Sequence, residues 1–443
     1  MIRSPGLVRG ESLDLRIEKG VYRGLGLARH EGQVVFVPRA LPGDRVRVLI
    51  ESVRGGYVEG KAESLLEPSP ERRPSPCPYV PRCGGCAYQE LTYEGQLRLK
   101  ESILRESLQR AGAAWDGPIT LAPSPERGWR MRASLHLGTR EGELLLGLLS
   151  EGTHEVVDLP ECLQLSERMN HAARGIRAAL LGRTDLWRRV KRIDLAESPS
   201  GPALVAAVET DLETREAAAL GFLAEGATEL TGLGIATGGR HHHFLSLRGT
   251  PYIRADVLGI ALRAHVRSFF QGNRFLVEDL ARTVVDLLPP GGPVLDLYAG
   301  VGLFALPLAA RGDPVVAIEL SPVAADDLAA NARRAKLVEV RVLKGDVAEE
   351  IASRPRQAGE RIVLDPPRTG AGPDLVAAIA ARRPEAVVYV SCDPPTLGRD
   401  LAAFAKRGYR PDRLVAFDLF PDTFHLEAVV RLVPADVTLP KLS

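Results

Sequence analysis

The segment Val294-Leu295-Asp296-Leu297-Tyr298-Ala299-Gly300-Val301-Gly302 decides the fold of the C-terminal half of the chain. A short apolar run, which we expect to be a strand, leads into a loop whose two glycines let the backbone approach a ligand closely. Further apolar runs alternate with Ala-rich segments that are typical of helices. This alternation predicts an α/β fold with a doubly wound, mostly parallel, Rossmann-like sheet. The predicted strands are 294–297, 315–318, 340–343, 362–364, 387–390, 414–419 and 428–432, and the predicted helices are 303–311, 322–335, 373–382 and 396–407.

Acidic residues follow several of these strands, and ligands of such sheets bind at the carboxyl ends of the strands. Glu319 ends the second strand, about 20 residues after the glycine loop, where a carboxylate can accept both ribose hydroxyls of a nucleotide. This pair fits NAD and S-adenosylmethionine equally well. Asp346, after the third strand, favours S-adenosylmethionine, because a carboxylate there can accept a hydrogen bond from an adenine amine. The link 420–427 is too short for a parallel crossover, so the last two strands should pair antiparallel.

A cysteine and a glutamate provide the candidate catalytic pair. Cys392 follows the fifth strand, and the dipole of a helix beginning near Thr396 favours its thiolate. Carbon 5 of uracil reacts poorly with a sulfonium methyl group, whereas addition of a thiolate at carbon 6 turns the ring into a reactive enolate. A base must then remove the proton from carbon 5. Glu427 opens the last strand and can be this base, and His425 is the rival.

The segment Asp365-Pro366-Pro367-Arg368, after the fourth strand, is where methyltransferases of this architecture present the acceptor. RNA cytosine-5 methyltransferases typically have a cysteine near this point, and this chain has none. An RNA cytosine-5 methyltransferase is therefore disfavoured.

The composition excludes several other classes of protein. The chain has 443 residues, with 57 Lys and Arg against 56 Asp and Glu, which gives a net charge of +1. At about 150 residues per domain this length predicts two to three domains. The balanced charge excludes a polycation, so nucleic acid can be bound only by local basic patches. No apolar run approaches the roughly 20 residues of a membrane span, and the first residues lack a secretory signal, so we expect a cytoplasmic protein.

Four of the five cysteines predict a metal site. Cys77, Cys83 and Cys86 lie close together, and Cys162 can supply a fourth thiolate. An odd number of cysteines in a chain of this kind argues against a disulfide framework. Four soft ligands suit either zinc or an iron–sulfur cluster, and the spacing alone does not decide between them.

The chain before residue 258 divides into two predicted domains. Several short strands within residues 1–67 predict a small barrel of the OB type, a fold that commonly binds oligonucleotides. Residues 68–257 predict a mixed α+β domain that holds the cysteine site, and residues 258–443 form the Rossmann-like domain.

With these motifs in order, the chain resembles the RNA uridine-5 methyltransferases, in particular the iron–sulfur-containing branch that modifies 23S ribosomal RNA. Residues 40–46 are similar to part of the family's TRAM domain, and Ser268-Phe269-Phe270-Gln271-Gly272-Asn273 is similar to a motif that contacts the methyl donor. The resemblance implies a class I S-adenosylmethionine-dependent fold, Cys392 as nucleophile, Glu427 as base and a [4Fe-4S] cluster, in preference to zinc, on the four cysteines. The implied donor-binding residues include the two glycines of the loop and are Gln271, Tyr298, Gly300, Gly302, Glu319, Asp346 and Asp365.

The resemblance also sets the expected substrate. We expect an enzyme that methylates carbon 5 of one uridine in RNA, with 23S rRNA as the substrate, and that works as a monomer without a membrane. A transfer-RNA substrate and a non-catalytic RNA-binding factor remain as alternatives. Gly272 and Asp393 depart from the residues that are more usual in these motifs, but neither change removes a catalytic group.

Overall fold

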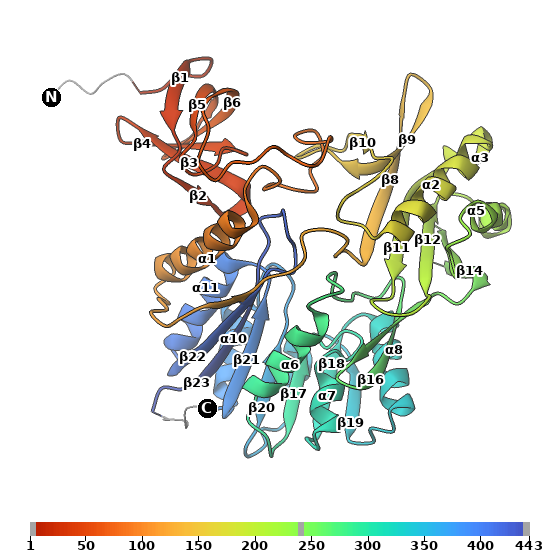
Figure 1. Cartoon of the computed structure of the whole chain (residues 1–443). Helices are drawn as coiled ribbons and strands as arrows, with labels where there is room; N and C mark the ends of the chain where they lie inside the picture. The colour runs from red at the N-terminus through yellow and green to blue at the C-terminus, as the bar shows by residue number, and fades with distance from the viewer. Residues whose placement is uncertain (1–5, 238–242, 437–443) are drawn as a thin grey trace.

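The predicted doubly wound sheet forms the C-terminal lobe of the computed structural model, which describes residues 6–237 and 243–436 (Figure 1). Its strand order is β19-β18-β17-β20-β21-β23-β22-β7, and neighbours from β19 to β21 pair parallel. All six residues of β21 are buried, as expected for a strand covered on both faces. The last two strands pair antiparallel, which confirms the prediction from the short link.

The elements of this lobe match the predicted pattern, and α6, α9 and the β15–β16 hairpin are additions to it. They are β15 (Tyr252–Val257), β16 (Ile260–His265), α6 (Val277–Leu287), β17 (Val294–Leu297), α7 (Ala305–Ala310), β18 (Val315–Glu319), α8 (Pro322–Arg334), β19 (Val340–Lys344), α9 (Val347–Ser353), β20 (Arg361–Leu364), α10 (Gly372–Ala381), β21 (Ala386–Ser391), α11 (Pro394–Ala405), β22 (Tyr409–Phe417) and β23 (Glu427–Pro434).

The N-terminal lobe is a six-stranded sheet in the order β1-β5-β6-β4-β3-β2. Its apolar core consists mainly of alternate residues of these strands, as in the buried positions of β5, because successive side chains of a strand point to opposite faces. Its elements are β1 (Ser12–Arg16), β2 (Lys19–Val21), the short helix η1 (Tyr22–Gly24), β3 (Leu25–His30), β4 (Gln33–Pro38), β5 (Arg45–Val53) and β6 (Val58–Glu67).

The central lobe is a seven-stranded sheet in the order β10-β9-β8-β11-β12-β13-β14, with helices packed against it. Its elements are β8 (Arg132–Arg140), β9 (Glu143–Leu149), β10 (Val156–Asp158), α2 (Glu167–Leu181), α3 (Thr184–Trp187), β11 (Val190–Glu197), β12 (Leu204–Thr210), α4 (Thr214–Ala217), η2 (Ala218–Phe222), α5 (Leu223–Gly226), β13 (Gly232–Thr237) and β14 (His243–Gly249).

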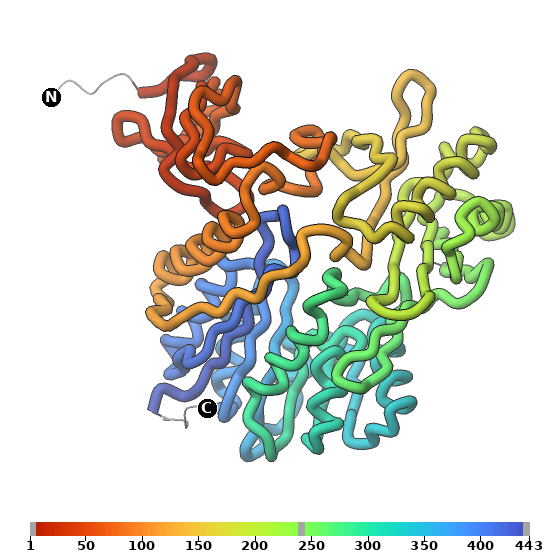
Figure 2. The backbone as a smooth tube through the Cα atoms, in the orientation of Figure 1, coloured from red at the N-terminus to blue at the C-terminus, as the bar shows by residue number. Residues whose placement is uncertain are grey.

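Three elements of the predicted central segment, residues 68–257, belong to the C-terminal lobe instead, and β15 is one of them. Helix α1 (Tyr93–Arg110) packs beside α11 (Figure 1). Strand β7 (Thr120–Ala122) is an edge strand parallel to β22. The chain then runs from the end of α1 across this lobe before it enters the central sheet (Figure 2). Within the part of the chain that the structure describes, no helix is long and apolar enough to cross a bilayer.

A buried ion pair fastens α1 to the C-terminal lobe. Lys100 Nζ lies 2.6 Å from Asp418 Oδ1, both side chains are fully buried, and Nζ also donates to Phe420 O at 3.0 Å. Lys100→Met leaves the Asp418 carboxylate buried without its cation, so we expect it to lower the free energy of unfolding by about 3–5 kcal/mol in chemical denaturation. Arg16→Ala removes the exposed pair with Glu67 and should change this energy by less than about 1 kcal/mol. Equal stability of the two variants would contradict the prediction.

Candidate functional site

The glycine loop and Glu319 lie against each other at the carboxyl edge of the C-terminal sheet. Gly300 and Gly302 have φ angles of 55° and 98°, a region that favours glycine. The amide of Gly300 donates to Glu319 Oε2 at 2.9 Å, and the amide of Ser321 donates to Oε1 at 2.6 Å. Each carboxylate oxygen keeps a second lone pair for a ribose hydroxyl. A side-chain carbon on Gly300 would meet no atom within 4 Å, so the loop borders open space.

A buried carboxylate, Asp296, and a half-buried one, Asp365, lie near this loop. Asp296 is fully buried, and among the described residues none donates a hydrogen bond of ordinary geometry to either of its side-chain oxygens. Burial, with the nearby charge of Asp365, raises its pKa well above the usual value. Burial also raises the pKa of Asp365 to about 7. Desolvated carboxylates without counter-charges suit a cationic ligand, and the sulfonium and ammonium groups of S-adenosylmethionine are cations.

The other predicted donor-binding residues lie around the same edge. Tyr298 is half-buried, and burial followed by the charge of Asp346 raises its pKa, so these two side chains are neighbours. Asp346 is exposed and caps α9, with Oδ1 accepting from the amides of Ala348 and Glu349 at 2.9 and 3.2 Å. Gln271 is buried, in the loop that precedes α6. Contact of these residues with a methyl donor stays a prediction.

Strand register brings Cys392 and Glu427 together. Ser391 of β21 pairs with Ala428 of β23, so the next positions toward the sheet edge are Cys392 and Glu427. Burial, together with the negative charges of Glu427 and Asp365, raises the pKa of Cys392 to about 12, and Arg368 opposes this shift. The expected preference for the thiolate at the start of α11 is therefore outweighed by burial and the carboxylates. Burial, with the charge of Asp365, also raises the pKa of Glu427 well above its usual value.

The rival base His425 lies in the same group of side chains. Burial, together with the positive charges of Arg368, Lys100 and Arg130, lowers its pKa to about 3. Its Nε2 lies 3.2 Å from Nη2 of Arg368. A group with this pKa is a weak base at neutral pH, which favours Glu427 for proton removal.

The N-terminal lobe reaches the same site through a residue that the sequence did not indicate. Tyr22 donates its hydroxyl to Asp393 Oδ2 at 2.7 Å, and Asp393 caps α11 directly after Cys392. The Tyr22 ring also packs edge-on against Phe424, with centroids 5.5 Å apart. Tyr22 and Asp393 are 371 positions apart in the sequence, so no local pattern could have revealed their hydrogen bond.

Comparison with known proteins identifies the family. A sequence model described as tRNA (uracil-5-)-methyltransferase matches residues 92–434, and the TRAM domain matches residues 7–62. The chain belongs to the tRNA (uracil-5-)-methyltransferase family. It is an S-adenosylmethionine-dependent RNA uracil-C5 methyltransferase, with a TRAM domain as its N-terminal lobe.

Relatives match along nearly the whole methyltransferase. It is 35% identical to a 23S rRNA (uracil(1939)-C(5))-methyltransferase RlmD of Chromohalobacter salexigens, with 94% of this chain and 88% of the relative covered. An uncharacterized RNA methyltransferase of Aquifex aeolicus is 32% identical, with 97% and 100% covered. The fold matches that of the Pyrococcus abyssi tRNA (uracil-54, C5)-methyltransferase in complex with S-adenosyl-L-homocysteine, with a TM-score of 0.72, 23% identity, and 95% and 100% covered.

The four predicted ligand cysteines of this methyltransferase line one cavity. Cys77, Cys83, Cys86 and Cys162 surround about 20 Å³ of space, all with free thiols. Burial raises the pKa of Cys86 to about 12, and it also raises the pKa values of Cys83 and Cys162. In the described ranges no group of three or more His, Cys, Asp or Glu side chains is placed so that it could hold a metal ion as it stands. The donor set fits a thiolate-bound group, and admitting one requires these side chains to turn and widen the cavity.

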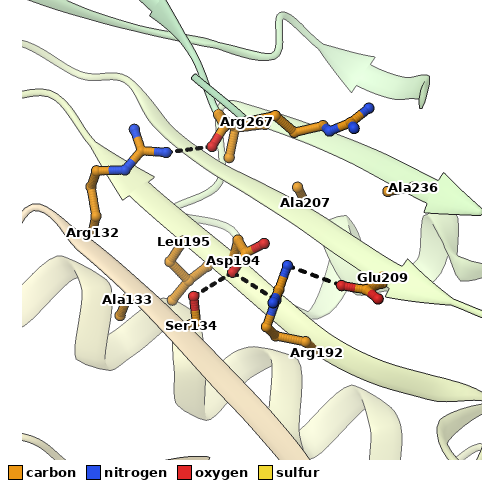
Figure 3. A pocket seen from close by; sticks show the side chains of 11 residues that line it. Arg132, Ala133, Ser134, Arg192, Asp194, Leu195, Ala207, Glu209, Ala236 and Arg267 are labelled. Carbon is orange, nitrogen blue, oxygen red and sulfur yellow. Dashed lines mark hydrogen bonds and ion pairs between the residues drawn. The ribbon is translucent and has the colours of Figure 1, made fainter. Parts of the chain in front are cut away.

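A second pocket of the methyltransferase, of about 420 Å³, is lined by arginines of the central lobe and of the loop between β16 and α6 (Figure 3). Arg192 is paired with Asp194 and Glu209, at 3.1 and 2.9 Å. Arg132 donates through Nη2 to Val266 O, while its Nη1 is buried without a partner among the described residues. Arg267 is exposed at the same pocket.

Proposed function

We propose that this methyltransferase modifies carbon 5 of one uridine in 23S rRNA through a covalent bond between Cys392 and carbon 6 of the ring. The observation that carries the mechanism is the register of β21 and β23, whose Ser391–Ala428 pair brings the next residues, Cys392 and Glu427, together at the carboxyl edge of the sheet. The rRNA substrate is supported by the 35% identity to a protein named for 23S rRNA.

The experiment that tests the substrate compares two RNAs. Purified enzyme is incubated with methyl-labelled S-adenosylmethionine and either a 23S rRNA transcript or a pool of tRNA transcripts, and labelled nucleosides are identified by mass spectrometry. We expect 5-methyluridine in the 23S transcript alone. Label in tRNA alone would show that tRNA, and not 23S rRNA, is the substrate. 5-Methylcytidine in either RNA would show that the enzyme does not modify uridine.

The side chains at the sheet edge divide the proposed reaction into two steps. The Cys392 thiolate adds to carbon 6, and the ring electrons move to carbon 5 and the O4 oxygen. Carbon 5 then takes the methyl group, and S-adenosylhomocysteine leaves. Glu427 removes the proton from carbon 5, and the ring electrons expel the thiolate. The target uridine has to leave its RNA stack to reach these groups.

The methyl donor is proposed to bind along the neighbouring strand ends. Glu319 and the amides of the glycine loop are suited to the ribose, and Tyr298 and Asp346 to the adenine. Asp296 and Asp365, whose pKa values are raised by desolvation and which have no counter-charge among the described residues, are suited to the cationic end of the donor. Gln271 is proposed to contact the donor from the loop that precedes α6.

The raised pKa of Cys392 predicts how its reactivity depends on pH. With a pKa of about 12, the thiolate fraction grows about tenfold per pH unit between pH 7 and 9. The rate at which iodoacetamide alkylates Cys392, as measured by peptide mass spectrometry, should therefore rise by the same factor for each pH unit. Arg368→Gln removes the cation that lowers this pKa, so alkylation should be slower than in wild type at every pH. A rate that levels off below pH 8 would contradict the raised pKa.

We further propose that the four cysteines hold a [4Fe-4S] cluster, which has no redox role in a methyl transfer. Convergence of Cys77, Cys83, Cys86 and Cys162 on one cavity supports this proposal. Iron and acid-labile sulfide analysis of anaerobically purified protein should give about four of each per chain. One zinc per chain would replace the cluster by a structural zinc site.

The arginine-lined pocket is proposed to hold an RNA phosphate. Burial and the positive charges of Arg267, Arg132 and Arg263 lower the pKa of the neighbouring His265 to about 4, which indicates a positive local field. Arg267→Gln should weaken RNA binding and reduce the slope of log K against log salt by about 0.7–1. Arg334→Gln, an exposed change on α8, should leave the slope unchanged. An unchanged slope for Arg267→Gln would contradict this contact.

A further inference from the structure

The loop that leads to Glu427 contains a buried carboxylate with no part in the chemistry described above. Asp422 lies five residues before Glu427 in the link Phe420–Glu427, is 3% exposed, and has a φ of 64°. Figure 1 shows this blue loop rising from β22 and β23 between the N-terminal and central lobes. Aspartate and asparagine tolerate such a φ better than most residues do.

Asp422 is the centre of a hydrogen-bond network that joins three distant segments. Its Oδ2 accepts from Nε2 of Gln89 at 2.9 Å and from Nε2 of Gln164 at 2.8 Å. Its Oδ1 accepts from Nε2 of Gln96, on α1, at 2.9 Å and from Arg73 at 3.3 Å. Its backbone adds three more bonds, one from its amide to Gln96 Oε1 and two to its carbonyl from the amides of residues 87 and 88, all at 2.8 Å.

Two of these partners also form the wall of the four-cysteine cavity. Gln89 and Gln164 line it, three residues after Cys86 and two after Cys162. The Oε1 atom of each glutamine is buried without a partner among the described residues, so the bond to Asp422 sets how each amide is turned. One carboxylate oxygen therefore bonds to both sides of the cavity.

We propose that Asp422 is a positioning residue that ties the loop bearing Glu427 to the walls of the four-cysteine cavity, so that what occupies the cavity controls where Glu427 lies. The inference rests on the proposed role of Glu427 as base. Because Gln89 and Gln164 share one buried acceptor, movement of either cavity wall displaces the loop. Coupling of this kind is reciprocal, so a loosened loop must also loosen the cavity.

The first experiment perturbs the loop and measures the cavity. Asparagine has nearly the size of aspartate and tolerates the same φ. In Asp422→Asn, however, an NH2 group replaces one of the two oxygens that accept from glutamine NH2 groups. At least one bond to the cavity wall is therefore lost, or one glutamine amide must turn. We expect iron release to a ferrous chelator to accelerate about 5- to 150-fold, the range of ordinary coupling between sites. In steady-state kinetics kcat should fall while KM for RNA stays unchanged.

Asp412→Asn is the matched control for this variant. Asp412 is a carboxylate of β22 that bonds Arg431 through both oxygens, at 2.8 and 2.7 Å, away from the cavity. It should release iron at the wild-type rate. If Asp422→Asn also releases iron at the wild-type rate, even with a reduced kcat, Asp422 affects only the loop, and the coupling to the cavity is overturned.

The second experiment perturbs the cavity and measures the loop, and it needs neither a bound metal nor RNA. Gln164→Met keeps the volume of the side chain and removes its amide. We expect backbone amides of residues 420–427 to exchange with deuterium faster, as measured by mass spectrometry, with the remaining C-terminal lobe unchanged. Gln33→Met removes a glutamine that bonds Leu7 in the N-terminal lobe and should leave the loop as in wild type.

The outcomes of this second experiment separate two kinds of failure. Unchanged exchange at residues 420–427 in Gln164→Met would overturn the coupling whatever the enzyme methylates. Faster exchange there would support it even if the cavity proves to hold zinc or the substrate proves to be tRNA.

Discussion

Cys392→Ala is expected to abolish methyl transfer to uridine while leaving the binding of S-adenosylmethionine unchanged. Without sulfur at this position carbon 6 receives no nucleophile, and carbon 5 stays too electron-poor to take the methyl group. Removal of a covalent nucleophile elsewhere costs on the order of 10⁶-fold in rate, so turnover should fall below detection. Cys392 lies outside the glycine loop and the Glu319 contacts, and donor affinity therefore survives.

Three measurements check this expectation together. Transfer of labelled methyl groups to RNA gives the rate, calorimetry gives donor affinity, and thermal unfolding excludes a folding defect. Ser391→Ala is the adjacent control, since the Ser391 hydroxyl contacts only the backbone of Asp393 in the described structure, and it should keep most of the activity. Wild-type turnover by Cys392→Ala would remove the covalent mechanism altogether.

Much of the C-terminal lobe follows from local pattern in the sequence. Its strands are continuous apolar runs because both faces of the sheet are covered, and the parallel order brings the residues after β17, β18, β20 and β21 to one edge. Proximity of Gly300 to Glu319 could be expected on this ground alone. The positions of strand β7 and helix α1 could not be expected, because neither a three-residue strand nor the apolar face of a helix indicates which distant element it will contact.

The residues that the sequence failed to indicate act across long separations. Lys100 with Asp418, Tyr22 with Asp393 and Gln164 with Asp422 are ordinary polar residues until the fold buries them together. The state of Cys392 shows the same limit. The start of a helix is visible in the sequence, whereas the burial and the charges of Glu427 and Asp365 that raise the pKa of its thiol are tertiary effects. Local motifs thus indicated the proposed reacting groups but not the contacts around them.

Glu427→Gln is expected to trap the enzyme on its RNA. Glutamine has the same shape but cannot take the proton from carbon 5, so methyl transfer goes forward and elimination of the Cys392 thiolate stops. His425 does not replace the base, because burial and three nearby cations hold its pKa at about 3. A protein–RNA adduct should persist on a denaturing gel, and its mass should exceed that of protein plus RNA by one CH2 unit, because carbon 5 gains a methyl group and the thiol loses a proton.

The dependence of this adduct on S-adenosylmethionine distinguishes a blocked elimination from a blocked addition. When the methyl donor is present, carbon 5 becomes methylated and the addition of the thiolate can no longer reverse. Without the donor, the addition is reversible and the thiolate can leave carbon 6 again. Glu427→Gln should therefore accumulate adduct only when the methyl donor is present, and Glu427→Gln combined with Cys392→Ala should give none. His425→Phe is the matched test of the rival base and should turn over without accumulating adduct. Free RNA carrying 5-methyluridine from Glu427→Gln at the wild-type rate would exclude Glu427 as the base, and a persistent adduct in His425→Phe would transfer that role to the histidine.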